Sequence, residues 1–302
     1  MTTTKELTGF INIDKPEGWT SHDVVAKLRK LTGIKKIGHA GTLDPFATGV
    51  LPMAIGSATR LIRFLKKSKQ YSAEIDLSFT TDTDDLTGEC LEKNSETIDQ
   101  ATFSERLKKF QGTIDQTPPL YSAKKVNGKK LYELMREGKD LKLEEIKSKQ
   151  VTIHEIKLVD FNFPKATFEV SCGEGTYIRS IARDLGGHLT KLRRLESNGF
   201  NIESSVRFED LAEGLAVDDL VQKSGEFIDL PLLSFQRQDI VALQQGRTIY
   251  LDKGNEDFDK FINCNGEESY LQCLDSSKEL IGLANILLVK GSELQIQPKI
   301  IL

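Results

Sequence analysis

The sequence predicts a chain of mixed α/β class that folds as two domains, and three observations lead to this prediction. Residues 71–79 alternate strictly between apolar and polar side chains, which is typical of a strand with one buried face. Residues 21–31 place apolar side chains at helical spacing between a capping Ser21 and a terminating Gly33. The length of 302 residues leaves room for a second, smaller domain near the C-terminus.

The other elements of the first 230 residues also alternate between strands and helices. We expect a strand at 9–14, helical structure in the second half of 50–65, a helix opened by the capping box Thr102-x-x-Glu105 and ended by Gly112, strands at 151–161 and 166–172, and a helix whose apolar face runs from Ile178 to Leu192.

Two segments differ from the rest in composition. Residues 118–150 are rich in lysine and begin with Pro118-Pro119, which favours a loop and helix that project from the body of the protein. Residues 237–302 contain a short helix that ends at Gly246, followed by β-type runs near 269–274, 279–289 and 294–301. We therefore place a domain boundary at residue 230.

Composition excludes several classes of protein. No apolar run approaches the length that spans a bilayer, and the N-terminus lacks an apolar signal core, so we expect a cytoplasmic protein. The four cysteines are scattered without a C-x-x-C pair, and the four histidines show no metal-ligand spacing. Walker and Rossmann glycine patterns are missing from the sequence. We expect no metal, no cofactor and no membrane partner.

The net charge of −4 conceals an asymmetry between the two halves of the chain. Residues 1–200 carry 32 lysines and arginines against 27 acidic residues, whereas residues 201–302 carry 9 against 18. A basic excess concentrated on one domain is an electrostatic footprint for phosphate groups. Basic runs are also common on solvated faces, so the charge alone leaves nucleic-acid binding as one of two interpretations.

The most informative segment is residues 38–49, which read Gly-His-Ala-Gly-Thr-Leu-Asp-Pro-Phe-Ala-Thr-Gly. Glycine and proline at this density indicate a loop with specific backbone angles, and such a loop can present Asp44 to a ligand at close range. The alternative is an ordinary surface turn, since aspartate favours turns. Spacing alone does not decide between these two interpretations.

This loop resembles the catalytic motif of the TruB family, the tRNA pseudouridine synthases that act on the T-loop uridine. Four other segments resemble motifs of the same family and occur in the same order along residues 8 to about 200. They are Asp14-Lys15-Pro16 with Gly18, the turn at 81–88 with Thr83, Asp84 and Gly88, the run Pro118-Pro119-Leu120-Tyr121-Ser122-Ala123 with Lys125, and Gly175-Thr176-Tyr177-Ile178-Arg179.

The resemblance implies a fold and a function. The catalytic domain, residues 1–230, would be a mixed and mostly antiparallel sheet flanked by helices, with an RNA-gripping insert at 118–150. Residues 231–302 would form a small β-rich, PUA-like domain. The function would be isomerisation of the uridine at position 55 of tRNA, with the T-arm stem-loop as partner and the protein as a monomer. The alternative is a non-catalytic RNA-binding or folding protein of the same fold. A guide-RNA-directed relative is a weaker rival, because such proteins lack the insert and bear basic tails.

The resemblance also assigns roles to individual residues. Asp44 would be the nucleophile, Arg179 its ion-pair partner, and Tyr71 an active-site tyrosine that stacks on the uracil and takes part in proton transfer at C5. The expected substrate-binding residues are His39, Tyr177, Leu192, Lys15, Lys124 and Lys129. Four of these residues have a structural alternative: a core tyrosine at Tyr71, a solvated arginine at Arg179, a structural histidine at His39 and structural support of the pocket at Lys15.

One departure from the family pattern concerns Leu192. The connection that follows Asp184-Leu185-Gly186 is shorter than in the family, which makes the alignment of Leu192 less secure. The other assigned residues lie outside this connection.

Overall fold

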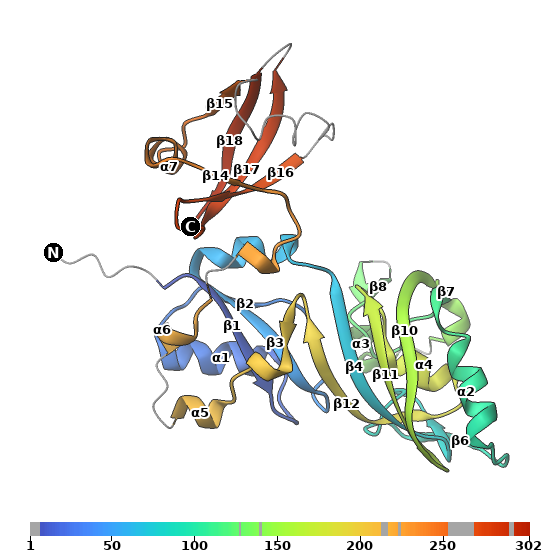
Figure 1. Ribbon diagram of the computed structural model, residues 1–302. Helices are drawn as coiled ribbons and strands as arrows, with labels where there is room; N and C mark the ends of the chain where they lie inside the picture. Colours follow the sequence, from blue (N-terminus) through green and yellow to red (C-terminus); the bar gives the residue numbers. More distant parts are fainter. Residues whose placement is uncertain are drawn as a thin grey trace.

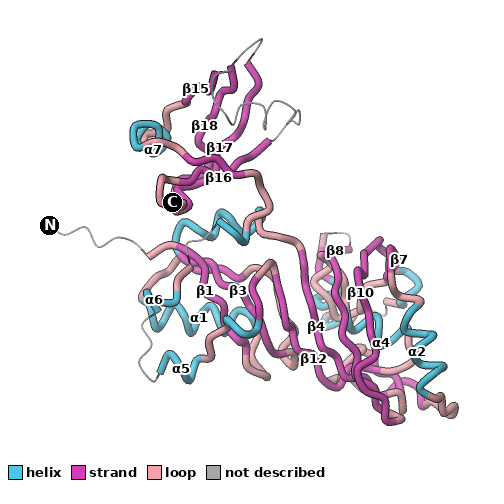
Figure 2. Tube along the Cα trace, in the orientation of Figure 1, coloured by secondary structure: helices cyan, strands magenta, loops and turns pink. Residues whose placement is uncertain are grey.

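Among the described residues, the computed structural model of the protein contains a nine-stranded sheet and a five-stranded sheet (Figure 1), together with two small hairpins. It describes residues 7–126, 128–138, 141–212, 217–222, 225–252, 269–289 and 293–302. Strands form the larger part of the regular structure, and most of the helices lie around the larger sheet, whereas α7 lies beside the smaller one (Figure 2). Among the described residues, no helix has the length and apolar character that crossing a bilayer requires.

The larger sheet has nine strands in a mostly antiparallel arrangement, as the resemblance implies. The order is β1-β3-β12-β4-β11-β10-β7, with β2 paired to β3 and β13 paired to β12. Only the pairing of β3 with β12 is parallel. The strands are β1 (Gly9–Lys15), β2 (Ile37–His39), β3 (Thr48–Ile55), β4 (Ser68–Asp76), β7 (Gly112–Gln116), β10 (Lys149–Asn162), β11 (Lys165–Gly173), β12 (His188–Ser197) and β13 (Phe200–Asn201).

Short helices and hairpins surround this sheet. The α-helices are α1 (Ser21–Thr32), α2 (Gln100–Lys108), α3 (Leu131–Arg136), α4 (Ile178–Asp184), α5 (Phe208–Ala212) and α6 (Val217–Leu220). The 3-10 helices are η1 (Gly56–Phe64), η2 (Leu143–Glu145), η3 (Ile202–Ser204) and η4 (Gly225–Phe227). Two small hairpins pair β5 (Phe79–Thr81) with β6 (Cys90–Lys93), and β8 (Lys125–Val126) with β9 (Lys129–Lys130).

The described strands of the second sheet all come from residues 232–301. They are β14 (Leu232–Ser234), β15 (Ile249–Asp252), β16 (Ser269–Leu274), β17 (Leu280–Val289) and β18 (Glu293–Ile301), in the order β14-β16-β17-β18-β15, with α7 (Arg237–Gln244) beside them. Apolar side chains of this sheet share a buried cluster with η1 and with the ring pair of Phe200 and Phe227. The second sheet therefore packs against η1 and shares one apolar cluster with the larger sheet.

Helix caps differ by a few residues from those expected. The N-cap of α1 is Thr20, which closes a capping box with Asp23, whereas Ser21 is buried and bonds to the Asp44 loop. Gly33 ends α1 in the left-handed conformation, as expected. The cap of α2 is Asp99, whose carboxylate accepts from the amide of Thr102. In both helices the polar group nearest the free amides caps the helix, wherever the strongest sequence motif lies.

The expected helix with an apolar face from Ile178 to Leu192 is wrong in its second half. The helix α4 ends at Asp184, and residues 188–197 form the central strand β12. Gly186 has a φ of +90°, and a side chain at Gly187 would overlap the backbone of Asp76. The two glycines end the helix and let the chain enter the sheet beside β4.

The helical structure expected in the second half of 50–65 is present as η1. The first half, for which no element was expected, belongs to β3, which is buried along nearly its whole length and therefore shows no alternation of apolar and polar side chains. The strand expected at 71–79 spans 68–76, and Phe79 begins β5 and stacks on His188. The strands expected at 9–14, 151–161, 166–172 and in the C-terminal segment are present within a few residues of their expected bounds.

Candidate functional site

A cavity of about 550 Å³ lies where the Asp44 loop, the middle strands of the large sheet, α4 and the 118–150 insert meet. The residues that line it include Asp44, Tyr71, Tyr177, Arg179 and Leu192. These five were singled out from the sequence, and folding brings them together from segments up to 148 residues apart. The lining continues into the apolar core of the domain, because Phe46, Ile178 and Leu192 belong to both.

Two buried cations hold the loop that carries Asp44. Lys15 is fully buried, and its Nζ donates to the carbonyls of Pro16 at 2.8 Å, Trp19 at 2.7 Å and Pro45 at 3.2 Å. Arg194, also fully buried, donates to the carbonyls of Val50 at 2.7 Å, Gly41 at 3.1 Å and Thr42 at 3.4 Å. Both cations use their donors on backbone carbonyls of the loop and its flanks, which fixes the chain on either side of Asp44.

Close packing of the backbone also fixes the start of β3. Gly49 has a φ of +102°, and a side chain there would overlap the backbone of Arg194 on the neighbouring strand. On the other side of the loop, the hydroxyl of Ser21 accepts from the amide of Leu43 at 2.9 Å. The carboxylate of Asp44 is thus carried by a rigid segment, although its side chain is 34% exposed to the cavity.

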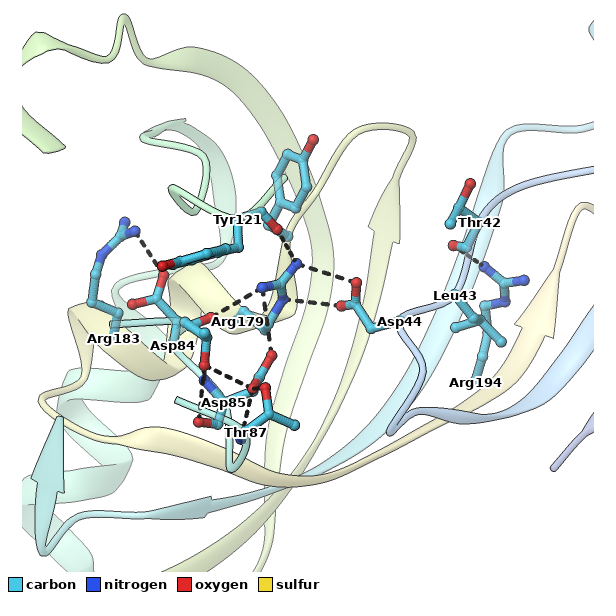
Figure 3. Close-up of polar contacts among 12 residues, drawn as sticks. Thr42, Leu43, Asp44, Asp84, Asp85, Thr87, Tyr121, Arg179, Arg183 and Arg194 are labelled. Carbon is cyan, nitrogen blue, oxygen red and sulfur yellow. Dashed lines mark hydrogen bonds and ion pairs between the residues drawn. The ribbon is translucent and has the colours of Figure 1, made fainter. Parts of the chain in front are cut away.

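Asp44 and Arg179 form a two-point ion pair at the wall of the cavity (Figure 3). Arg179 Nη2 donates to Oδ1 of Asp44 at 3.2 Å, and Nε lies 3.0 Å from Oδ2. The side chain of Arg179 is only 6% exposed. The pairing that the resemblance implies is therefore present in the geometry, and a solvated arginine at this position is ruled out by its burial.

Arg179 is itself held from three directions. Its Nη1 donates to the carbonyl of Thr83 at 3.0 Å, and its Nη2 donates to the carbonyl of Tyr121 at 3.0 Å. Nη1 also lies 3.5 Å from the buried carboxylate of Asp85, which in turn accepts from the amide of Thr87 at 2.9 Å. Figure 3 shows Arg179 between Asp44 on one side and Asp85 on the other. A guanidinium bound this way has little freedom to turn away from Asp44.

Tyr71, Leu192 and Tyr177 supply the apolar and aromatic lining. Tyr71 on β4 and Leu192 on β12 are each 6% exposed. Burial raises the pKa of the Tyr71 hydroxyl, and the nearby Arg194 opposes that effect in part. The backbone of Tyr177 forms a reciprocal pair with the side-chain amide of Gln116, at 2.8 and 3.0 Å, which fixes the entry to α4. Tyr71 both packs in the core and lines the cavity, and its role toward a substrate stays a prediction.

The remaining predicted residues lie outside the cavity lining. His39 is at the end of β2, with its ring edge against His22, and burial lowers its pKa. Lys15 holds the loop by donating to the carbonyl of Pro45, and burial lowers the pKa of Lys15 to about 8. Lys124 and Lys129 belong to the insert, where Lys129 is paired with Glu137 at 2.9 Å. Residues 127, 139 and 140 of that insert lie outside the described residues.

Sequence reasoning missed several residues that shape the site. Arg194 is not among the residues predicted for the site, because nothing in the local sequence shows that an arginine will be fully buried. The insert contributes Tyr121, Tyr132 and Arg136 to the lining, whereas the prediction had emphasised its lysines. The available signal was the pair of tyrosines inside a polar segment, since aromatic side chains commonly stack on unpaired bases.

Metal-ligating side chains do not cluster in the part of the chain that the structure describes. In those residues, no group of three or more histidine, cysteine, aspartate or glutamate side chains is arranged to hold an ion. Cys264 lies outside the described residues, and Cys172 and Cys273 are buried thiols whose pKa values burial raises to about 11 and about 12.

Comparison with known proteins finds a matching family model and several relatives. The family model described as TruB family pseudouridylate synthase, N-terminal domain, matches residues 29–178. The tRNA pseudouridine synthase B of Microcystis aeruginosa is 38% identical over 304 residues, which cover 97% of this chain and 99% of that protein. The enzyme of the same name from Gloeothece citriformis is 48% identical over 217 residues, covering 68% of this chain and 69% of that protein.

Solved structures show the same fold. A chain in the crystal structure of a Cbf5-Nop10-Gar1 complex superposes with a TM-score of 0.69 and 23% identity, covering 98% of this chain and 85% of that one. A chain in a structure of an H/ACA RNP bound to a substrate RNA gives a TM-score of 0.67 at 20% identity, with 97% and 84% covered. At this level of identity the likeness concerns the fold alone.

Proposed function

We propose that this chain, which belongs to the TruB family of pseudouridylate synthases, converts the T-loop uridine at position 55 of tRNA to pseudouridine. The observation that carries this proposal is the Asp44–Arg179 pair, held by buried groups on both sides at the wall of a cavity lined by Tyr71 and Leu192. The names of the relatives, tRNA pseudouridine synthase B, support tRNA as the substrate.

The proposed reaction is an isomerisation in which the base stays bound throughout. The N1–C1′ glycosidic bond breaks, the uracil rotates, and a C5–C1′ bond forms while C5 loses its proton and N1 gains one. No group is added and no redox change occurs. A uridine stacked in RNA must first be extruded into the cavity, which costs about a few kcal/mol.

In this proposal Asp44 is the nucleophile. Its carboxylate would add to the substrate at C1′ or at C6, forming a covalent intermediate that divides one difficult rearrangement into easier steps. Arg179 balances the carboxylate charge from inside the wall, so that the carboxylate oxygens stay oriented when the base displaces water. The two residues meet only because α4 and the β2–β3 loop face each other across the cavity.

Tyr71 is assigned to the base itself. Its ring would stack on the extruded uracil, and its hydroxyl would take part in proton transfer at C5. Because burial raises the pKa of this phenol, its hydroxyl stays protonated at neutral pH. The hydroxyl would therefore pass a proton on during the reaction and would not act as a phenolate base. Tyr177 and Leu192 would complete the walls that hold the base.

The other predicted residues have supporting roles in this proposal. His39 would contact the RNA beside the extruded base, and Lys15 would act on the substrate through the loop that it anchors. Lys124 and Lys129 would contact phosphates from the insert. Residues 1–230 would form the catalytic domain with its insert at 118–150, and residues 231–302 the PUA-like domain. We further propose a monomer that acts on the T-arm stem-loop in the cytoplasm, where tRNA is used, without a metal or a cofactor.

The direct test is to incubate the purified chain with a T-arm hairpin and to map pseudouridine along the RNA. The expected result is conversion at the position that corresponds to 55 and at no other uridine of the loop. A hairpin in which that uridine is replaced by cytidine is the matched control. Tight binding of the hairpin without conversion would instead identify a non-catalytic RNA-binding protein.

A further inference from the structure

We propose that Asp84 and Arg183 form a positioning pair that fixes the turn at residues 82–88 against α4 and thereby holds Arg179 in contact with Asp44. This inference rests on the proposed function, and it names residues that act on the chemistry only through Arg179. The turn is the segment between β5 and β6, and Figure 3 shows its residues Asp84 and Asp85 beside Arg183 and Arg179 of α4.

The turn and the helix are joined at two levels, one helical turn apart. At the first level Arg179 donates to the carbonyl of Thr83 and faces the carboxylate of Asp85. At the second level Arg183, four residues later, donates from Nη1 to Oδ2 of Asp84 at 3.0 Å. Side chains four residues apart lie on the same face of a helix. Asp84 therefore sits between the two turn residues that contact Arg179, and its own side chain holds the next arginine.

The second level is buried and well satisfied. The side chains of Arg183 and Asp84 are 14% and 7% exposed. Arg183 Nη2 also donates to the carbonyl of Thr117 at 2.9 Å, which the hydroxyl of Ser180 shares at 2.8 Å. The pair thus ties three segments together: the turn, α4 and the chain that leads into the insert. It touches no residue that lines the cavity except through these segments.

The backbone at Asp84 shows why the side chain matters. Asp84 has a φ of +61°, a left-handed conformation that disfavours residues other than glycine, asparagine and aspartate. Its amide donates to Thr81 and its carbonyl accepts from Leu189. A turn that bends this sharply directs the carbonyl of Thr83 and the carboxylate of Asp85 toward Arg179. Loss of the Asp84 side-chain contact would leave that direction set by the backbone alone.

The charged groups around Asp84 give the pair a pH dependence. Arg183, Arg179 and Asp184 of α4 face it, and β12 approaches through Leu189, while the neighbouring His188 bonds to the carbonyl of Phe79. Burial raises the pKa of Asp84 to about 6, although Arg183 opposes that rise. Acidification through pH 6 therefore neutralises Asp84 and removes the ion pair.

Acidification is expected to change folding stability and catalytic rate in opposite directions. Between the ordinary aspartate pKa and pH 6, the folded chain binds a proton at Asp84 that the unfolded chain does not. Lowering the pH through 6 thus increases the contribution of Asp84 to folding stability. A decline in rate near pH 6 that comes without a fall in thermal midpoint would carry the signature of the positioning pair.

The test compares D84N, R183Q and the double variant with the wild type in single-turnover assays on a T-arm hairpin. Asparagine keeps the shape of the side chain and tolerates the positive φ, so D84N removes the charge alone. The expected result at pH 8 is a rate lower by about 10- to 100-fold in each single variant, with little further loss in the double variant. Hairpin affinity should change by less than about threefold, because neither residue lines the cavity.

The pH profile gives the second readout. The wild-type rate should fall below pH 6, whereas the rate of D84N should be low and flat across the same range. The matched control is E169Q, which removes an ion pair with Lys157 on β10 and β11. This control should retain both the rate and the profile of the wild type.

The outcomes separate this inference from the proposed function. Wild-type protein that forms no pseudouridine at any pH refutes the proposed function. Active wild type with D84N equal to it in rate and profile overturns the positioning pair. If the variants do not fold, the remaining test is the pH profile of the wild type. A rate that falls near pH 6 with an unchanged thermal midpoint supports the positioning pair. A rate that stays constant from pH 5 to 7 overturns it.

Discussion

Two walls of the cavity meet at Asp44 and use their cations differently: the loop wall, formed by residues 38–49, and the α4 wall, formed by α4 with the 82–88 turn. On the loop side, the buried cations Lys15 and Arg194 donate to backbone carbonyls, and no described carboxylate lies within 4.0 Å of either charge. On the α4 side, Arg179 and Arg183 are matched by the carboxylates of Asp44, Asp85 and Asp84. The first wall uses cations to shape the backbone, and the second uses ion pairs to aim a guanidinium.

This difference explains how a loop rich in glycine and proline can hold the proposed nucleophile in a fixed position. A cation that donates to several carbonyls fixes backbone atoms directly, because each carbonyl can move only with its peptide plane. A cation paired with a carboxylate instead fixes one side chain against another. Asp44 therefore receives its position from the loop wall and its orientation from the α4 wall. The predictions below separate these two contributions.

The largest effect is expected at the point where the walls meet. D44N keeps the shape of the side chain but removes the proposed nucleophile, so single-turnover pseudouridine formation should fall by at least about a thousandfold. Hairpin affinity, measured by filter binding, should stay close to that of the wild type. The control is D160N, which alters an exposed aspartate on β10. Substantial residual turnover in D44N would show that another group attacks the substrate.

The next effect distinguishes a cation that shapes backbone from one in an ordinary ion pair. R194M removes the guanidinium donors to the carbonyls of Val50, Gly41 and Thr42, so the free energy of unfolding should fall by about 3 kcal/mol. R193M alters the adjacent residue, whose partly exposed pair with Asp14 should contribute less than about 1 kcal/mol. Chemical denaturation of both variants provides the measurement. Equal losses in the two would contradict the account of the loop wall.

A smaller effect is expected for cations that lie outside both walls. Replacing Lys124, Lys125, Lys129 and Lys130 together by glutamine should weaken hairpin binding by about tenfold and flatten its dependence on salt. The rate at saturating hairpin should not change, because none of these lysines lines the cavity. Lys129 should contribute least, since Glu137 already pairs with it.

The control for this set carries the same change of charge elsewhere in the domain. It replaces the exposed lysines 27, 30, 35 and 36, on and after α1, by glutamine. An equal loss of affinity in the control would show that general charge attracts the RNA. No loss in either set would move the RNA contact toward the C-terminal sheet.

The smallest effect concerns the pH dependence of the loop wall. Burial lowers the pKa of Lys15 from 10.5 to about 8, so between these values the unfolded chain binds a proton that the folded chain has released. The Lys15 contribution to stability therefore rises as the pH increases through this range. In K15M that slope should disappear, which urea denaturation at pH 8, 9 and 10 can measure. An unchanged slope in K15M would show that Lys15 stays fully charged in the folded protein.

Much of the fold could be predicted from local pattern. The strict alternation around Tyr71, Ala73 and Ile75 indicated one buried face, and β4 has it. Gly33 ended α1 as expected. The prediction failed where a segment is buried on both faces, as in β3, or where glycines divide an apolar run, as at Gly186 and Gly187. A buried strand and a buried helix share one composition, so periodicity cannot separate them.

The sequence by itself determined the kind of chemistry. The motif around Asp44, the run that contains Arg179 and the resemblance of both to one family specified the carboxylate and its partner without coordinates. Tertiary structure alone decided what holds them. Burial of Arg194, the double link between α4 and the 82–88 turn, and the tyrosines of the insert depend on contacts between segments far apart in the chain. Residue types can be read from the sequence, but the charge environment of each group exists only once the sheet has assembled around it.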